Sequence, residues 1–555
     1  MAALRDTVQL RRTGQGDSRA AISMQTGLLL LLVLLSPGAL CDNSLGSVDD
    51  EQGTMGSQGP VVVIIGAGIS GIAAAGKLHK HGFRRIQVLE ATGRTGGRIR
   101  TERFAKGLVE IGAQWIHGPS PGNPVFQLAS QFGLLGPDAL LEENQKINSD
   151  GYPPSIPVAY SSSGRKIDPE VMTNVTELYS TWLAQTRNFT NGYCDPEGSV
   201  GNFIREKIAH SSQEWDKEQV EMNMAILRGL LNIECCVTAA HSMDQVALCP
   251  FGEYTMLPGL DCTFPKGFES LVNHMKAPLP SGTVLLNKAV KSIHWHGSFP
   301  GSNSHVYPVQ VQCEDGDSFV ADHVIVTVPL GFLKKQSVDF FSPPLPPRKM
   351  QAIKNLGFGT NNKIVLEFEK PFWDSNTTVI QIVWEGESPL TEPKEDLKQN
   401  WMKKLPVFVV LEPPEQMGHV LCGFIAGEES EYMETLTDEE ILSAMTDLFR
   451  KFTGNPELPP PISMVRSQWH SQPYTGGSYS YVAVGSSGID VDNLAEPLPT
   501  DKKVLKLLQV LFAGEATERN FYSTTHGALM SGWREAQRLI DRYSDLGVTV
   551  SKAKL

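Results

Sequence analysis

The residues VVVIIGAGISG, from Val61 to Gly71, predict a buried strand, a glycine turn and the start of a helix. A second predicted strand, IQVLE, ends at Glu90. Gly66 allows the tight turn, Gly68 lets the backbone approach a pyrophosphate, and Gly71 lets helix and strand pack closely. The helix N-terminus favours phosphate, and an acid about 20 residues further on can accept ribose hydroxyls. The pattern therefore predicts a dinucleotide-binding α/β unit and leaves both NAD and FAD open.

The length of the chain calls for more than this one unit. At 555 residues it exceeds one ordinary core, so two domains or more are expected. α/β segments occur at the start, in the middle and at the end, separated by stretches of a different pattern. We predict a nucleotide-binding domain from residues 59–150, 268–345 and 485–545 and a substrate-binding domain from 151–267 and 346–484. The active site is expected between the two domains.

Net charge limits the partners of the chain, and cysteine content bears on its redox state and on metal binding. The formal net charge of −13 argues against nucleic acid and is compatible with a cationic ligand. The chain has eight cysteines, two of them adjacent at Cys235 and Cys236. Loss of a leader that ends at Cys41 leaves an odd number, which favours reduced thiols. The sequence holds no CxxC pair or His/Cys cluster, so no metal site is predicted.

The two ends of the chain carry conflicting address signals. Residues 1–58 contain an apolar run, Leu28 to Leu35, which with its upstream arginines resembles a signal peptide. This run is too short to span a bilayer as a helix. The tail, residues 546–555, ends in Ala-Lys-Leu, a close variant of the peroxisomal Ser-Lys-Leu signal. We expect a peroxisomal or cytoplasmic protein without a stable membrane span, with the secretory pathway as the alternative.

A second glycine turn decides between the two dinucleotides. FAGEAT, Phe512 to Thr517, is followed by FYSTTHGA and a helix, so an acid and a helix N-terminus again meet. An NAD enzyme with one mononucleotide fold has no need of this second cradle. FAD does need it, because its flavin ring lies far from its adenine. The sequence therefore predicts FAD, with Arg98 in GGR and His117 in GAQWIHG in loops close to it.

These motifs resemble those of the flavin-containing amine oxidases. GAGISG, GGR, GAQWIHG, GTNNK, YTGGSYSY, FAGEAT and STTHGALMSGWREA follow one another in the family order over essentially residues 60–545. The resemblance is greatest to family members that oxidise N-acetylated polyamines. It implies an α/β fold in which a Rossmann-like FAD-binding domain of discontinuous segments joins an α+β substrate-binding domain. This is the two-domain architecture of amine oxidases and p-hydroxybenzoate hydroxylase-like proteins.

The resemblance also implies a reaction. Hydride passes from the carbon beside a secondary amine of acetylated spermine or spermidine to flavin N5, and O₂ is reduced to hydrogen peroxide. The imine is hydrolysed to an aldehyde and a shorter polyamine. A spermine oxidase of the same fold is the alternative, and a flavin-fold binding protein without turnover is a further one. The chain is expected to be a monomer that acts on a small molecule.

The catalytic and substrate-binding residues carry over from the family motifs one by one. Lys363 in GTNNK resembles the lysine that holds a water against flavin N5. His117 resembles the residue that meets the polyamine beyond the flavin, and Asn361 resembles another substrate contact. Tyr254 and Asp261 resemble residues of the substrate pocket, where the acid is expected to pair with an amine.

The aromatic wall and the cofactor contacts complete the expected site. Tyr479 or Tyr481 in GSYSY is expected in the wall that selects the amine, and the sequence leaves the choice open. Ser478 stands where monoamine oxidases have a cysteine in a similar motif, so FAD is expected to be non-covalent. The expected cofactor-binding residues are Gly66, Gly68, Ser70, Gly71, Glu90, Arg98, Gln114, Trp115, Val290, Glu515, Thr524 and Thr525.

Overall fold

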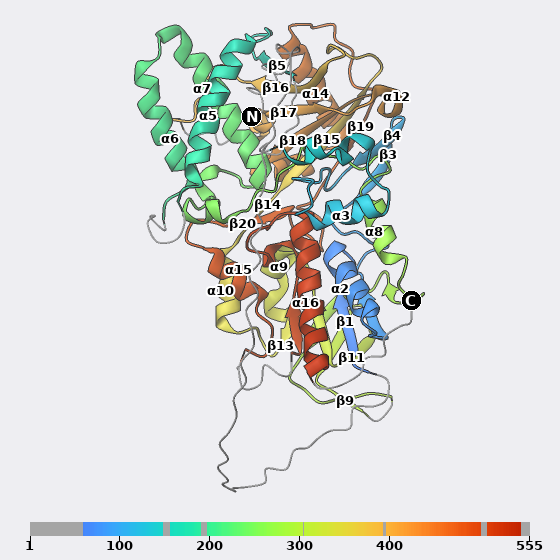
Figure 1. The fold of residues 1–555 in the computed structure, drawn as a ribbon. Coiled ribbons are helices and arrows are strands. Elements are labelled where there is room, and N and C mark those ends of the chain that lie inside the picture. The colour runs from blue at the N-terminus through green and yellow to red at the C-terminus, as the bar shows by residue number, and fades with distance from the viewer. Residues whose placement is uncertain are drawn as a thin grey trace, which may run out of the picture.

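The computed structural model describes residues 59–147, 156–189, 197–302, 305–391, 396–500 and 508–545. The apolar leader run and the terminal Ala-Lys-Leu both lie outside these residues. In the described part of the chain, no helix combines the length and apolarity that a bilayer crossing requires. The α/β prediction is confirmed, since the structure consists of mixed sheets with helices packed on them (Figure 1).

The first sheet is parallel and collects its strands from distant parts of the sequence. Its strand order is β21-β12-β1-β2-β6. Alternate residues of β1 reach opposite layers, because successive side chains of a strand point to opposite faces. Val62 and Ile64 join one core cluster, and Val63 and Ile65 join another. The strands are β1 (Val61–Ile65), β2 (Arg85–Leu89), β6 (Val284–Leu285), β12 (His323–Val326) and β21 (Val510–Phe512).

Helices cover one face of this sheet, and a second sheet covers the other. On the helical face, α2 and α16 lie side by side although they come from opposite ends of the chain (Figure 1). On the opposite face, the order of the second sheet is β11-β10-β7-β13. The helices on the helical face are α2 (Ile69–Lys80), α3 (Pro124–Gln131), α8 (Glu269–Lys276) and α16 (Thr525–Asp545). With the second sheet, on the other face, pack α9 (Leu330–Phe340), α10 (Pro347–Asn355) and α15 (Gly488–Ala495). The strands of the second sheet are β7 (Val290–His294), β10 (Val309–Cys313), β11 (Ser318–Ala321) and β13 (Phe341–Ser342).

The other half of the molecule is built on a six-stranded sheet with helices on both faces. Its order is β19-β15-β18-β17-β16-β5. Along β15, Val365 packs towards α5, α6 and α7, whereas Ile364 and Leu366 pack towards α14. The strands are β5 (Ile156–Ser161), β15 (Asn361–Phe368), β16 (Thr377–Val383), β17 (Val407–Val410), β18 (His419–Ala426) and β19 (Ser463–Arg466). The helices are α5 (Pro169–Thr186), α6 (Val200–Ser211), α7 (Lys217–Thr238), α13 (Glu428–Glu434) and α14 (Asp438–Thr453).

Local signals explain where α14 begins and ends. The Thr437 side chain accepts from the backbone of Glu440, and the Glu440 carboxylate accepts from the backbone of Thr437. This capping box satisfies donors that have no partner within the helix. At the other end Gly454 has a φ of 64°, which glycine adopts without steric cost. The sequence TDEEILSAMTDLFRKF thus forms an amphipathic helix with a cap at each end.

Short elements make up the rest of the described secondary structure. Two-stranded ladders join β3 (Thr101–Phe104) to β4 (Gly107–Glu110), β8 (Phe299–Pro300) to β9 (Val306–Tyr307), and β14 (Gly357–Gly359) to β20 (Tyr479–Tyr481). The short helices are α4 (Glu142–Gln145), α11 (Leu397–Asn400) and α12 (Pro414–Met417). The 3₁₀ turns are η1 (Pro137–Leu140), η2 (Ser212–Glu214), η3 (Met243–Gln245), η4 (Cys249–Glu253), η5 (Trp401–Lys404) and η7 (Glu515–Thr517).

The expectation of reduced thiols is wrong for Cys249, which is disulfide-bonded. Among the described residues five cysteines are free: Cys235, Cys236, Cys262, Cys313 and Cys422. A count of cysteines shows whether all can pair, but pairing itself depends on which sulfur atoms the fold brings together.

Replacing Gly71 with alanine is expected to lower the free energy of unfolding by about 3 kcal/mol or more. A Cβ at this position lies 2.0 Å from the carbonyl oxygen of Gly66, so the glycine turn and α2 must move apart. Gly76→Ala is the matched control in the same helix, because its Cβ comes no closer than 4.0 Å to a neighbouring atom. Alanine there gains about 1 kcal/mol of helix propensity. Urea unfolding of the two variants checks the prediction, and equal midpoints would contradict it.

Candidate active site

One large cavity runs through both halves of the molecule. Its volume is about 1860 Å³. Pockets for drug-sized ligands are typically about 300–1,000 Å³, so this one has room for a large cofactor together with a substrate. Of the predicted site residues, Gly71 lies outside the lining, where it packs α2 against the turn. The others all line the cavity: Gly66, Gly68, Ser70, Glu90, Arg98, Gln114, Trp115, His117, Tyr254, Asp261, Val290, Asn361, Lys363, Tyr479, Glu515, Thr524 and Thr525, together with Tyr481.

The first glycine turn forms one end of the cavity. Gly66 has a φ of 102°, and its N–H donates to Leu89 O at 2.8 Å, so the turn is tied to β2. Gly68 is the N-cap of α2 and offers no side-chain cap, so N–H groups of the first helical turn remain for a phosphate. Glu90 is buried and accepts from Ala67 N at 2.8 Å. Thr92 donates to the other Glu90 oxygen.

The second glycine turn gathers three distant segments around one carboxylate. Glu515 is 4 % exposed and accepts from Arg98 Nη1 at 2.7 Å and from Ser480 Oγ at 2.6 Å. It also accepts from the backbone N of Ser523 at 2.8 Å. Ser523 has a φ of 66°, which is uncommon outside glycine, and it lies immediately before the N-terminus of α16. This carboxylate therefore holds the turn that presents Thr524 to the cavity.

Lys363 is buried at the start of β15 and binds three acceptors. Its Nζ donates to Glu110 O at 2.8 Å, to Gly112 O at 2.7 Å and to Gln114 Oε1 at 2.9 Å. Burial lowers the pKa of Lys363, and nearby Cys422 and Glu110 act in the opposite direction. The three acceptors match the three protons of an ammonium group. Lys363 thus fastens the segment after β4 to β15, and its contact with a water beside the flavin stays a prediction.

His117 and Asp261 form a close pair at the cavity wall. His117 Nδ1 lies 2.5 Å from Asp261 Oδ2. Burial in the wall lowers the pKa of His117, but the Asp261 carboxylate outweighs it, so the pKa lies above its ordinary value. Tyr254 lies near the same acid, and its ring meets that of Tyr522 edge to face at 5.5 Å. Burial and then Asp261 raise the pKa of Tyr254 to about 12, which keeps the phenol neutral.

Asn361 and Tyr479 are linked to each other in the cavity wall. Asn361 Nδ2 donates to the Tyr479 hydroxyl at 2.9 Å, and that hydroxyl donates to Cys236 O at 2.5 Å. Asn361 Oδ1 is buried and has no partner among the described residues, which makes it a candidate acceptor for a ligand N–H. The Tyr481 hydroxyl donates to Gln245 instead. Ser478 exchanges hydrogen bonds with the backbone of Asn361.

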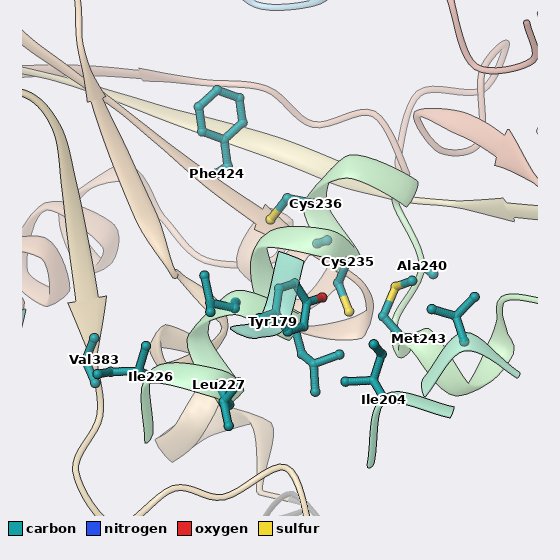
Figure 2. Close-up of a cluster of buried hydrophobic side chains, with 14 of the residues drawn as sticks. Tyr179, Ile204, Ile226, Leu227, Cys235, Cys236, Ala240, Met243, Val383 and Phe424 are labelled. Atoms are coloured by element: carbon teal, nitrogen blue, oxygen red, sulfur yellow. The ribbon is translucent and has the colours of Figure 1, made fainter. Parts of the chain in front are cut away.

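Several cavity residues were not predicted from the sequence. The last turns of α7 contribute Glu234 and Cys236, and the sheet contributes Phe424. The Phe424 ring stacks on Trp115 at 5.8 Å, and Lys363 Nζ lies 5.6 Å from its centre. Figure 2 shows Cys236 and Phe424 in the apolar cluster that packs α7 against the sheet. The end of this helix, LLNIECCVT, has the composition of a core helix, so the sequence gave little signal for these residues.

Comparison with known proteins identifies the family. Residues 69–540 match the family model described as flavin containing amine oxidoreductase. The chain is 56 % identical over 488 residues to the bovine (Bos taurus) peroxisomal N(1)-acetyl-spermine/spermidine oxidase, covering 87 % of this chain and 95 % of the relative. The human (Homo sapiens) protein of the same name is 53 % identical over 509 residues, covering 90 % of this chain and 98 % of the relative.

A plant relative extends the comparison. Polyamine oxidase 1 of rice (Oryza sativa subsp. japonica) is 34 % identical over 521 residues, covering 87 % of this chain and 98 % of the relative. The family match begins at Ile69, where α2 starts, and spans Gly71, the Lys363 strand and the second glycine turn. The chain belongs to the flavin containing amine oxidoreductase family.

Proposed function

We propose that the enzyme oxidises the secondary amine of N-acetylated spermine and spermidine, giving an aldehyde, a shorter polyamine and hydrogen peroxide. The observation that carries this proposal is the single cavity that joins both glycine turns to Lys363, His117 and Asn361. The names of the bovine and human relatives support the substrate class. The carboxylate of Glu234 in the same cavity suits a ligand with a cationic amine.

The cofactor is FAD, held without a covalent bond, and the residues of the cavity fit it. We propose that Gly66, Gly68 and Glu90 hold the adenosine and pyrophosphate. The uncapped start of α2 and a carboxylate with a lone pair still open suit these groups. Arg98 and Glu515 are proposed to hold the ribityl side. When bound, FAD accepts the hydride and is reoxidised by O₂.

We propose that the remaining lining residues orient the amine and exclude water. An amine gives up hydride in its neutral form, and an apolar wall favours the neutral form because burial disfavours charge. Trp115, Phe424 and the proposed wall residue Tyr479 supply this surface. Asn361 Oδ1 is proposed to accept from the amine N–H, since it lies buried beside that wall. Lys363 is proposed to hold the loop that carries Gln114 and to orient a water by exchanging one of its three acceptors for it.

We also propose the domain division and cellular address expected above. A nucleotide-binding domain from 59–150, 268–345 and 485–545 and a substrate-binding domain from 151–267 and 346–484 accord with the two groups of layered sheets. The names of the bovine and human relatives favour the peroxisome. The chain is proposed to act as a monomer.

Acetylated substrates are expected to be oxidised with a kcat/KM at least tenfold above that of free spermine, a difference of about 1.4 kcal/mol. Acetylation removes one positive charge from the substrate. The acetylated amine therefore enters the cavity without the desolvation cost of that charge. Peroxide release from the purified holoenzyme with N1-acetylspermine, N1-acetylspermidine and spermine measures the ratio. Higher efficiency on spermine would support a spermine oxidase. Bound flavin that none of the three amines bleaches under anaerobic conditions would support a binding protein without turnover.

A further inference from the structure

Both oxygens of the Asp261 carboxylate contact the short loop that carries His117 and Gly118. Oδ2 lies 2.5 Å from His117 Nδ1, and Oδ1 accepts from the backbone N of Gly118 at 3.1 Å. The Asp261 side chain is 4 % exposed, whereas that of His117 is 52 % exposed. The imidazole therefore lies between the carboxylate and the open cavity.

Other contacts hold the same loop independently of this carboxylate. Ile116 and Cys262 form an isolated antiparallel bridge, in which Ile116 N donates to Cys262 O at 2.8 Å. On the other side, Asn123 Nδ2 donates to His117 O at 2.8 Å. The main chain of the loop is thus fixed by backbone and amide contacts. The carboxylate is left to fix the imidazole ring itself.

We propose that Asp261 is a positioning residue that acts through His117, keeping Nδ1 protonated and turning Nε2 towards the amine substrate. A carboxylate that accepts from one ring nitrogen determines which nitrogen carries the proton and how the ring is oriented. When the ring is neutral, Nε2 then has a lone pair available for a substrate N–H. This role replaces the direct pairing of Asp261 with an amine, and it rests on the proposed polyamine oxidase function.

The charged and titratable neighbours of His117 agree with this arrangement. His526, at the start of α16, lies close enough to interact with His117, and burial followed by that interaction lowers the pKa of His526 to about 3. His526 is therefore neutral at physiological pH. Tyr254 is neutral as well, since its pKa is raised. Asp261 is the acid that acts on the pKa of His117, and it raises that pKa.

A double-mutant cycle on the holoenzyme separates indirect from direct action. Asp261→Asn is expected to slow anaerobic flavin reduction by N1-acetylspermine about tenfold, within the usual range for coupled residues. In the His117→Ala background the same substitution is expected to change the rate less than twofold. Asp138→Asn is the matched control, because its carboxylate lines the same cavity and is not among the groups that bind or shift His117. An equal loss from Asp261→Asn in both backgrounds would overturn the proposal in favour of direct amine binding.

A second measurement does not depend on turnover. Diethyl pyrocarbonate modifies neutral imidazole, so peptide mass spectrometry of the His117 peptide across pH reports the pKa of that ring. In the wild type this pKa is expected above 6.5, and Asp261→Asn is expected to lower it because the negative charge is lost. A wild-type value at or below 6.5 would refute the pairing, even if the variant does not fold. A wild type that oxidises no acetylated polyamine would instead refute the proposed function and leave this titration as the test of the pair.

Discussion

Glu515→Ala is expected to yield a chain that loses its FAD during purification. The carboxylate is 4 % exposed and binds Arg98, Ser480 and the backbone of Ser523. Its removal leaves a guanidinium without its acid, and breaking such a pair costs about 3–5 kcal/mol when both groups are buried. The Arg98 side chain is 24 % exposed, so water can partly solvate its charge and we expect a cost at the lower end of that range. The turn before α16 loses its fixed position at the same time, and with it the proposed contacts to the flavin ring.

The ratio of flavin to protein absorbance after gel filtration measures this loss. Glu518→Ala is the matched control, since Glu518 follows the same turn, pairs with Arg534 at 3.5 Å and lies outside the cavity lining. The control is expected to retain its flavin. The flavin content of Glu515→Gln should lie between those of Glu515→Ala and Glu518→Ala, because the amide keeps the shape of the side chain but loses its charge. Full flavin occupancy in Glu515→Ala would show that the second turn is not a cofactor site.

Lys363→Met is expected to reduce turnover about a hundredfold while FAD remains bound, as small displacements of catalytic groups have effects of this order. The substitution preserves the apolar stem but leaves Glu110 O, Gly112 O and Gln114 Oε1 without their donor. The segment after β4 then loses its link to β15. Stopped-flow measurements of flavin reduction and of reoxidation by O₂ locate the affected half-reaction.

Lys349 provides an unusually close control for this experiment. Its Nζ is also buried and donates to three carbonyl oxygens, those of Asn493, Leu494 and Glu496, but it lies outside the cavity lining. Lys349→Met is expected to lower the thermal unfolding midpoint without slowing the folded enzyme. Equal losses of turnover in the two variants would mean that Lys363 acts through stability alone.

The parts of the site that sequence predicts are those encoded by contiguous residues. Gly66, Gly71 and Glu90 follow from one motif, because the tight turn, the close helix and the acid are all set by local geometry. The family motifs likewise gave the positions of Lys363 and Glu515. Each of these residues lines the cavity except Gly71, which packs behind it.

The parts that sequence did not predict depend on which distant side chains meet. Asp261 was expected to pair with an amine, but its nearest partner is His117, 144 residues away. Glu515 pairs with Arg98 across 417 residues, and no local pattern records that contact. The C-terminal end of α7 has the composition of a core helix, so Glu234 gave little sign that it faces the cavity.

The scattered origin of the parallel sheet has a consequence for protein synthesis. β1 pairs with β12, and β12 in turn pairs with β21, so the strand order does not follow the order of translation. While the ribosome is still making residues 508–545, β12 has an open edge and α2 lacks its neighbour α16. Such edges and apolar faces are prone to aggregate until they are covered. Glu515 lies in this same last segment. We therefore expect a nascent chain to bind FAD tightly only after α16 has been translated.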